Sequence, residues 1–352
     1  MNVELLRGAM KKAGLDALVL LSPINIRYFS RFYITDGAAV ITGDKAVMIT
    51  DSRYIEAARA QADEMEVLLY DREHALSALI REALSGCRTV GAEEMSLPHA
   101  EWTAYEKLLG VTLTPCETII KELRAIKKPY ELESVIAAQR IAEKALDEVL
   151  GLIHPGMSER ELAAELTYRM LLHGGEGNSF DPITITGTKT SMPHGVPGDE
   201  IIQAGDFVTM DFGCLKNGYC SDMTRTVAVG YATDEMRRVY DTVLEAQLAG
   251  IAAAKAGVTG AAIHNAGAKV IADAGYGPYF GHGFGHSLGL EIHESPRASA
   301  TYDRPLQEGV IVTAEPGIYL PGKFGVRIED MIYLTAEGCM NLTKAPKELI
   351  IL

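Results

Sequence analysis

The sequence predicts an α/β (α+β) protein with two domains, and three observations lead to this prediction. Helical and strand-like patterns alternate over the first 120 residues, which is typical of a small α/β domain. Residues 123–134, LRAIKKPYELES, then contain the start of a long helix and indicate a domain boundary. Beyond it, two helices followed by several strands occur twice in succession. We therefore expect one domain at residues 1–122 and a second at residues 123–352.

The first domain is expected to contain short apolar strands separated by amphipathic helices. Its first segment, NVELLRGAMKKAG, has the apolar spacing of a helix and ends in a glycine. Further helices are predicted at residues 52–62 and 74–84. Apolar and β-branched runs predict the strands ALVLL, AAVIT, AVMIT, EVLLY, RTVGAE and VTLTP.

The second domain is expected to open with two helices whose starts are marked in the sequence. Pro129 fits the first turn of a helix, and Glu131 behind it favours the helix N-terminus. Ser158 and Glu161 have the spacing of a capping box, and this helix is predicted to stop at the glycine pair after residue 173. Strand-like segments follow at residues 181–187, 206–214 and 219–229.

The same order of elements returns in the second half of this domain. Helices are predicted at residues 233–257 and 259–275, followed by strands near 279–286, 309–319 and 325–334. The starts PGMSERELAA and AGVTGAAIHN both contain a glycine, an apolar residue and a hydroxyl cap. This repetition predicts a duplicated domain with an internal pseudo-two-fold axis, and ligand sites often form in such a seam.

Composition and charge exclude several classes of protein. The chain of 352 residues is 47% apolar, and its net charge of −14 would repel nucleic acid and anionic membranes. No apolar run approaches the roughly 18 residues that span a bilayer, and MNVELLRGAM lacks the apolar core of a signal peptide. The five cysteines fit reduced thiols, and Cys214 and Cys220 lack the second pair that a zinc site would add. We expect a cytoplasmic protein that binds neither nucleic acid nor membranes.

Two aspartates are predicted to lie close together in a hairpin. The dipeptide Asn-Gly within residues 207–229, FVTMDFGCLKNGYCSDMTRTVAV, is a strong signal for a two-residue turn. With this turn Asp211 faces Thr224 and Asp222 faces Gly213, so that both aspartates share one face and can share an ion. Because aspartate is depleted in strands, the pair needs a reason. The hairpin alone leaves two interpretations open, an ion site or aspartates that face water.

Three histidines are crowded into the glycine-rich residues 281–294, GHGFGHSLGLEIHE. The alternating glycines disfavour a helix, so this is not the helical HExxH motif of zinc peptidases. In an extended backbone His282, Phe284 and His286 share one face, while the bare glycines allow another backbone or a ligand to approach closely. A single histidine would more often be structural. Together with His293, these histidines favour ligation or catalysis.

Two glutamates complete a set of candidate metal ligands. Glu315 precedes a proline, which favours extended backbone, and Glu329 alternates with apolar residues in GVRIED. Buried carboxylates are costly unless they are paired or bind a metal, and Arg327 could instead form a plain ion pair with Glu329. Four carboxylates and one imidazole fit two divalent cations such as Mn²⁺, Co²⁺ or Zn²⁺. The set comprises Asp211, Asp222, His286, Glu315 and Glu329.

At these residues the chain resembles the metallopeptidases with the pita-bread fold, the group of aminopeptidase P, prolidase and methionine aminopeptidase. The resemblance covers essentially the whole chain and rests on MDFGCLKNGYCSDMTRT, GHGFGHSLGLEIHE, TAEPGIY and GVRIED, in that order. The N-terminal domain, with TDSRYIEAA, is similar to that of the Xaa-Pro branch and of creatinase. The resemblance implies a creatinase-like N-terminal α/β domain, a pita-bread catalytic domain and a homodimer.

The resemblance also implies roles for the metal ligands. Asp211 and Asp222 would bind one cation, with Asp222 also bridging, and His286 would bind the other. Glu315 and Glu329 would belong to the shared set. A water between two cations loses a proton near neutral pH, and Glu315 could then carry that proton to the leaving nitrogen.

Further residues are implied to act on the substrate. His194 in MPHG would flank the substrate, and His293 would hold the scissile carbonyl oxygen by a hydrogen bond. His282 would line the pocket for the residue after the cleaved bond, and Arg297 would face the substrate carboxylate. Arg327 is expected to lie behind the ligands as an ion-pair partner.

The sequence thus predicts a dinuclear metallopeptidase that cleaves the Xaa-Pro bond of dipeptides or short peptides with proline at the second position. A dipeptidase and an aminopeptidase for longer peptides remain alternatives, because the closure of the pocket beyond the second residue is not visible in the sequence. A metal-free hydrolase of the creatinase type and a non-enzymatic binding module are less well supported. Relatives of both kinds are expected to have lost the ligands, whereas all five are present here.

Overall fold

The computed structural model describes residues 2–62 and 64–352, and the chain divides into two compact units, Met1–Arg124 and Ala125–Leu352. This division lies close to the boundary expected between residues 122 and 123. Among the described residues, no helix combines the length and the apolar character needed to cross a bilayer.

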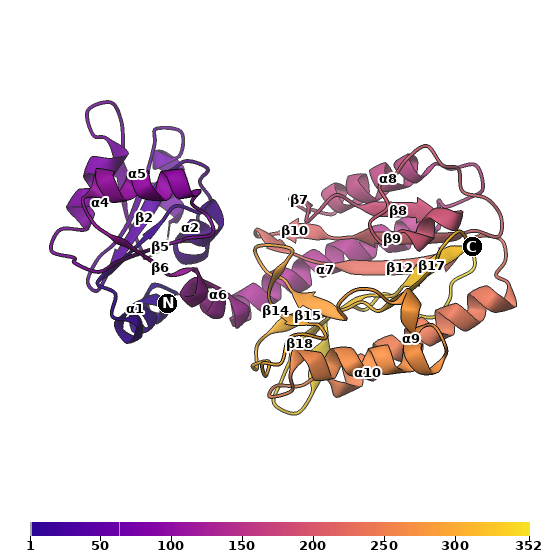
Figure 1. Cartoon of the computed structure of the whole chain (residues 1–352). Coiled ribbons are helices and arrows are strands. Elements are labelled where there is room, and N and C mark those ends of the chain that lie inside the picture. Colours follow the sequence, from indigo (N-terminus) through magenta and orange to yellow (C-terminus); the bar gives the residue numbers. More distant parts are fainter. Residues whose placement is uncertain (1, 63) are drawn as a thin grey trace. The chain divides into compact units, whose positions relative to one another are not determined.

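The N-terminal unit, in which Figure 1 labels β2, β5 and β6, is built around a mixed six-stranded sheet. The strand order is β4-β3-β2-β1-β5-β6. The sheet is antiparallel where β1 meets β2 and parallel where β1 meets β5. All six predicted strands are confirmed: β1 Ala17–Leu20, β2 Gly37–Thr42, β3 Ala46–Thr50, β4 Glu66–Leu69, β5 Val90–Ala92 and β6 Leu113–Pro115. The helices are α1 Asn2–Ala13, α2 Pro23–Ser30, α3 Ile55–Gln61, α4 Leu76–Ala83, α5 His99–Leu109 and α6 Glu117–Ala125, of which α2, α5 and α6 were not predicted.

The second unit contains two pairs of long helices, each followed by strands, and this confirms the predicted repetition. The pairs are α7 Pro129–Leu150 with α8 Glu159–Leu172, and α9 Asp234–Ala253 with α10 Gly260–Asp273. The side chains of Ser158 and Thr259 cap α8 and α10 by accepting backbone N–H bonds. Helix α9 ends before the predicted residue 257, because residues 256 and 257 donate backbone bonds to Thr335 and Leu306 instead.

The strands of this unit form several small sheets. The first half contains β11-β10-β7 and β12-β9-β8, and the second half contains β14-β13-β15-β18-β19 and the pair β16-β17. The strands are β7 Gly177–Asn178, β8 Ile183–Thr186, β9 Phe207–Phe212, β10 Cys214–Lys216, β11 Tyr219–Cys220, β12 Met223–Ala228, β13 Gly285–Ser287, β14 Glu294–Ala298, β15 Ile311–Ala314, β16 Gly317–Leu320, β17 Phe324–Arg327, β18 Asp330–Leu334 and β19 Cys339–Asn341.

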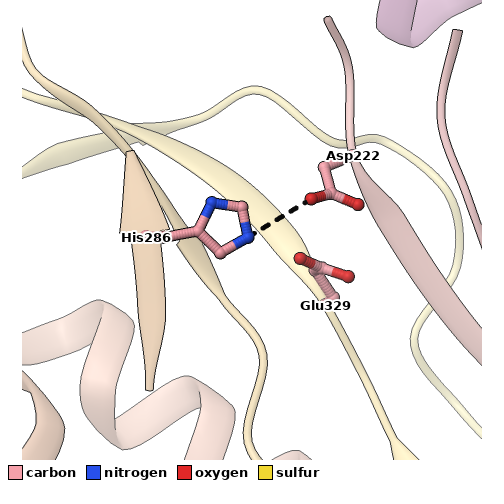
Figure 2. Close-up of side chains that lie close together, drawn as sticks. All are labelled: Asp222, His286 and Glu329. Atoms are coloured by element: carbon pink, nitrogen blue, oxygen red, sulfur yellow. Dashed lines mark ion pairs between the residues drawn. The ribbon is translucent and has the colours of Figure 1, made fainter. Parts of the chain in front are cut away.

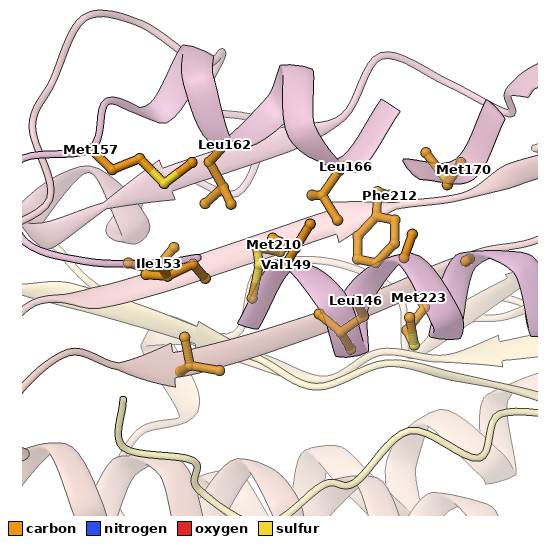
Figure 3. Close-up of a cluster of buried hydrophobic side chains, with 14 of the residues drawn as sticks. Leu146, Val149, Ile153, Met157, Leu162, Leu166, Met170, Met210, Phe212 and Met223 are labelled. Atoms are coloured by element: carbon orange, nitrogen blue, oxygen red, sulfur yellow. The ribbon is translucent and has the colours of Figure 1, made fainter. Parts of the chain in front are cut away.

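The first helix pair buries its apolar faces against β9 and β12. Figure 3 shows Leu146 and Val149 of α7, Leu166 of α8, and Phe212 and Met223 of the strands in one cluster. Each of these side chains is at most 3% exposed, so removal of their apolar surface from water stabilises the scaffold that carries the aspartates.

The predicted hairpin register is confirmed. Thr224 pairs with Asp211, and the turn residues Asn217 and Gly218 have φ of 51° and 75°, as a tight two-residue turn requires. Lys216 pairs with Tyr219 in the same register on the other side of Asp222. The hairpin therefore keeps one register along its whole length, although its two ends belong to two different short sheets.

The glycine-rich segment differs from its predicted form. Only residues 285–287 form a strand, β13, because the N–H of Phe284 bonds to His264 Nδ1 of α10 rather than to a neighbouring strand. Phe284 is fully buried among apolar side chains, whereas His282 and His286 line a cavity. The expectation that the three side chains share one face was therefore wrong for Phe284. A Cβ on Gly285 would lie 1.9 Å from the Thr313 carbonyl oxygen, so this glycine is required by sheet packing.

A substitution at Gly250 tests this packing. A Cβ built on Gly250 of α9 would lie 2.0 Å from Cζ of Phe284. We expect Gly250→Ala to lower the free energy of unfolding by about 1–3 kcal/mol, as in other overpacked cores. Urea unfolding measures the change, with Gly8→Ala as the control, because that helical glycine has open space around its Cβ position. Equal stability of the two variants would contradict the packing of Phe284.

Candidate metal centre and substrate cavity

The second unit contains a cavity of about 750 Å³ that is lined by the predicted site residues. Its walls come from strands of both halves and from the loops that join them. All ten residues predicted for the site line this cavity: His194, Asp211, Asp222, His282, His286, His293, Arg297, Glu315, Arg327 and Glu329. Side chains far apart in the sequence therefore converge on one volume.

Strand register places three of the four carboxylates at equivalent points of the two halves. Asp222 lies at the junction between the β10–β11 and β9–β12 pairs, opposite residue 213. In the second half Ala314 pairs with Asp330 and Gly317 pairs with Arg327 in one register, which puts Glu315 opposite Glu329 in the gap between the pairs. Carboxylates at such junctions line the cavity and do not occupy a paired position of either ladder.

Asp222, His286 and Glu329 form the tightest group. One ligand atom of each lies within 4.8 Å of those of the other two, and Figure 2 shows the three side chains facing one another. Nε2 of His286 lies 3.5 Å from Oδ2 of Asp222 and 3.4 Å from Oε1 of Glu315. Nδ1 of His286 donates to the Ser287 carbonyl, which leaves Nε2 as a free acceptor facing the carboxylates. The geometry is that of a metal-binding imidazole.

Asp211 lies beside this group and is paired with an arginine. Nη2 of Arg327 donates to Oδ2 of Asp211 at 2.6 Å. Glu329 instead accepts a hydrogen bond of 2.6 Å from the Thr224 hydroxyl, so the plain Arg327–Glu329 ion pair considered from the sequence does not form. Arg327 also donates to the Pro193 carbonyl and so holds the loop that carries His194. Arg327 therefore links Asp211 to the loop that carries His194.

In the absence of a cation, burial disfavours the ionised form of the carboxylates. Burial raises the pKa of Asp222 well above its ordinary value, and the charges of Asp211 and Glu315 raise it further. Burial and the charge of Asp222 likewise raise the pKa of Glu329, and burial raises the pKa of Glu315. A bound cation reverses this preference, because it stabilises the ionised forms.

The residues present fit divalent cations. Oδ1 of Asp211 and Oδ1 of Asp222 are buried and have no hydrogen-bond partner within residues 2–62 and 64–352. A buried oxygen without a partner is costly, and a metal ion satisfies it. Burial lowers the pKa of His286, which keeps its imidazole neutral and able to ligate. Oxygen donors with one nitrogen suit several first-row divalent metals.

The remaining predicted residues lie around this group. His286 pairs across the sheet with Arg297, so both side chains point to the same face, and Arg297 is exposed in the cavity. The rings of His293 and His286 meet edge to face with centroids 4.5 Å apart. Nε2 of His282 accepts a hydrogen bond from the Tyr319 hydroxyl. His194 is exposed in the cavity.

Three supporting residues were not found from the sequence. Thr224 donates to Glu329 and accepts from Arg327, and Thr313 donates to Glu315 while accepting from the backbone N–H of His286. The Tyr319 hydroxyl joins His282 to Arg327. The register that pairs Thr224 with Asp211 was the one signal that could have indicated such a role. The other two depend on contacts between strands whose pairing the sequence does not reveal.

Comparison with known families agrees with this geometry. Residues 133–336 match the model of metallopeptidase family M24, and residues 3–126 match the creatinase/prolidase N-terminal domain. The chain belongs to metallopeptidase family M24. The protein is thus a metallopeptidase of this family, with the expected creatinase-type N-terminal domain and pita-bread domain, and its family uses divalent metal cofactors.

Several relatives match this metallopeptidase over its full length. The structure of an Xaa-Pro dipeptidase from Bacillus anthracis superposes with a TM-score of 0.96 at 40% identity and covers 100% of this chain and 99% of that one. An X-Pro aminopeptidase from Thermotoga maritima gives 0.93 at 34% identity, covering 98% and 100%. The Xaa-Pro dipeptidase of Pyrococcus furiosus is 36% identical over 99% of both chains.

The raised pKa of Glu329 predicts that replacing this residue has opposite effects on the stability of the metal-free and the metal-bound protein. A carboxyl whose pKa is raised by folding contributes stability below its ordinary pKa and loses it as the pH rises. In metal-free protein at neutral pH, we therefore expect Glu329→Gln to raise the unfolding temperature, and the gain to shrink toward pH 4. With divalent metal bound, the same substitution should lower it. Differential scanning calorimetry of both forms checks this, and a decrease in the metal-free protein would contradict it.

Proposed function

We propose that this metallopeptidase hydrolyses the Xaa-Pro bond at the N-terminus of dipeptides or short peptides with two bound divalent cations, Mn²⁺, Co²⁺ or Zn²⁺. The observation that carries the proposal is the convergence of four carboxylates and one imidazole on a single cavity, with two buried carboxylate oxygens unpartnered among the described residues. The names of the relatives, Xaa-Pro dipeptidase and X-Pro aminopeptidase, support the substrate class.

The proposed ligands follow from the two halves of the fold. Asp211 and Asp222, whose Oδ1 atoms are buried and unpartnered among the described residues, would hold one cation, and Asp222 would also contribute to the second. His286 would hold the second cation through Nε2, and Glu315 and Glu329, which lie opposite each other in register, would contribute to both. One divalent cation would leave part of the negative charge of the four carboxylates uncompensated. Two cations therefore fit this group better than one.

The chain's own side chains then have separate tasks. Bound divalent cations acidify water and polarise a peptide carbonyl. Glu315 accepts the proton of the attacking water and passes it to the departing proline nitrogen. Burial lowers the pKa of His293, and its neutral ring donates a hydrogen bond to the carbonyl oxygen as negative charge develops there. His194, on the loop held by Arg327, flanks the substrate.

Two residues are proposed to recognise the proline side of the substrate. His282, fixed by Tyr319, lines the pocket for the residue after the cleaved bond. The Arg297 guanidinium forms no ion pair or hydrogen bond in the part of the chain that the structure describes, and it is exposed in the cavity. It is therefore available to a C-terminal carboxylate. This favours dipeptides over the alternative, an aminopeptidase acting on longer peptides. A metal-free creatinase-like hydrolase is less well supported, because the ligand set is intact. The homodimer and the cytoplasmic location stay predictions.

Variants of the ligands and of His293 separate metal binding from catalysis. We expect Asp222→Ala or Glu329→Ala to abolish both metal content and activity while the far-ultraviolet circular dichroism stays near wild type. We expect His293→Ala to lower kcat by about 100-fold, as loss of an oxyanion donor does, with metal content unchanged. Metal analysis and steady-state kinetics on the same samples check this. Near-normal turnover of Asp222→Ala would rule out the proposed ligand set.

A substrate panel tests the specificity. We expect cleavage of Xaa-Pro dipeptides in the presence of Mn²⁺ or Co²⁺, weaker cleavage of Xaa-Pro-Xaa peptides, and none of matched Xaa-Ala peptides. Arg297→Met should raise KM for Xaa-Pro by roughly tenfold, the loss of one charge-assisted bond, and leave KM for the Xaa-Pro amide unchanged. Cleavage of neither proline peptide would remove the Xaa-Pro assignment, and equal use of both lengths would favour the aminopeptidase.

A further inference from the structure

Within residues 2–62 and 64–352, the ring of His293 forms no hydrogen bond that would hold it in place. Its ring is exposed in the cavity, and its recorded contact among the described residues is the edge-to-face one with His286. A donor that must meet a carbonyl oxygen within a few tenths of an ångström needs a fixed position. The position of His293 therefore depends on the backbone that carries it, the loop of residues 288–293 between β13 and β14.

This loop is folded over one carboxylate, that of Glu294. The Glu291 N–H donates to Oε1 of Glu294, and the Gly289 N–H donates to the Glu291 carbonyl. A Cβ on Gly289 would lie 2.8 and 2.9 Å from the two carboxylate oxygens of Glu294, so the carboxylate packs directly on that glycine. Its side chain is only 6% exposed. The charge of Glu294 thus lies beneath the loop rather than in water.

Lys127 forms an ion pair with this buried carboxylate. Its Nζ lies 2.9 Å from Oε2 of Glu294, and its side chain is 1% exposed. The lysine backbone is itself fixed, because its N–H donates to the Gly309 carbonyl and the preceding residue, Ile126, bridges to Val310. The ammonium group therefore reaches the loop from a fixed segment that adjoins β15. Neither Lys127 nor Glu294 lines the cavity.

We propose that the Lys127–Glu294 ion pair is a positioning device that holds His293 where it can donate to the scissile carbonyl oxygen. The inference rests on the proposed function, since it assumes that role of His293. Replacing Glu294 leaves the buried Lys127 ammonium without this partner, so that it must find water or another one. Replacing Lys127 removes one contact that holds the Glu294 carboxylate under the loop. In both variants the loop over Glu294 has to open, and His293, which adjoins Glu294 in the chain, moves with it. The metal ligands lie on other segments and stay in place.

The experiment compares the same substitutions in two backgrounds. Glu294→Gln and Lys127→Met are made in the wild-type chain and in His293→Ala, and kcat, KM and metal content are measured with an Xaa-Pro dipeptide and Mn²⁺. The matched control is Lys269→Met, which removes a lysine from the exposed pair with Asp273, where the side chains are 73% and 64% exposed and Nζ lies 2.7 Å from Oδ2. Lys127→Arg, which keeps the charge, tests rescue.

In the wild-type background we expect Glu294→Gln and Lys127→Met to lower kcat per metal-loaded enzyme by about 10- to 100-fold, as misplacement of a catalytic group by about 1 Å does. KM should change little, because the lost contact is made in the transition state. In His293→Ala the same substitutions should change kcat by less than about twofold, and Lys127→Arg should retain most activity. Lys269→Met should match wild type.

An equal loss of kcat in both backgrounds would show that the pair does not act through His293 and would overturn the inference. So would a loss that disappears after normalisation to metal content, since that is a purely structural effect. If Lys127→Met does not fold, the double variant Lys127→Met/Glu294→Gln, which leaves no buried charge at this pair, is compared in the two backgrounds instead. A His293→Ala chain with wild-type kcat would instead refute the proposed role of His293 itself.

Discussion

Mutual repulsion among buried carboxylates is the constraint on which the rest of this structure depends. Asp222 and Glu329 are each less than 5% exposed and face Glu315 and Asp211 across one cavity. Such a group is unfavourable unless positive charge compensates it. Arg327 and the threonine hydroxyls compensate it only in part, since one oxygen of each aspartate stays unpartnered among the described residues. Bound cations would supply the missing positive charge and so stabilise the folded chain.

The duplicated architecture explains how so much charge can be assembled without disrupting a sheet. Each half contains a hairpin whose pairing is interrupted and resumed in the same register. Asp222, Glu315 and Glu329 lie at these interruptions, and Asp211 lies two positions before the one in the first half. The helices cover the apolar sides of these hairpins, as the cluster around Leu146 and Phe212 shows. The polar sides are left to face one another. Glycines allow β13, which carries His286, to approach β15 closely.

Local signals in the sequence were enough to predict much of this arrangement. The Asn-Gly turn fixed the partner of Asp211, and the Ser158 capping box marked the start of α8, because both depend on residues near in the chain. Phe284 was misplaced because a period-two pattern assumes a strand, and a bond to His264 from a distant helix ended that strand early. The Lys127–Glu294 pair could not be predicted, because 167 residues separate its members and no pattern links them.

The shared register of each hairpin limits where the length of the chain can change. Side chains alternate between faces, so inserting one residue between a turn and its carboxylate would turn that carboxylate away from the cavity. The tips at residues 217–218 and 321–323 are free of this restriction, because they close the hairpins beyond the last paired residues. Insertions and deletions among homologous chains should therefore concentrate at these tips, while the spacing from the last rung of each ladder to the acidic residue stays constant.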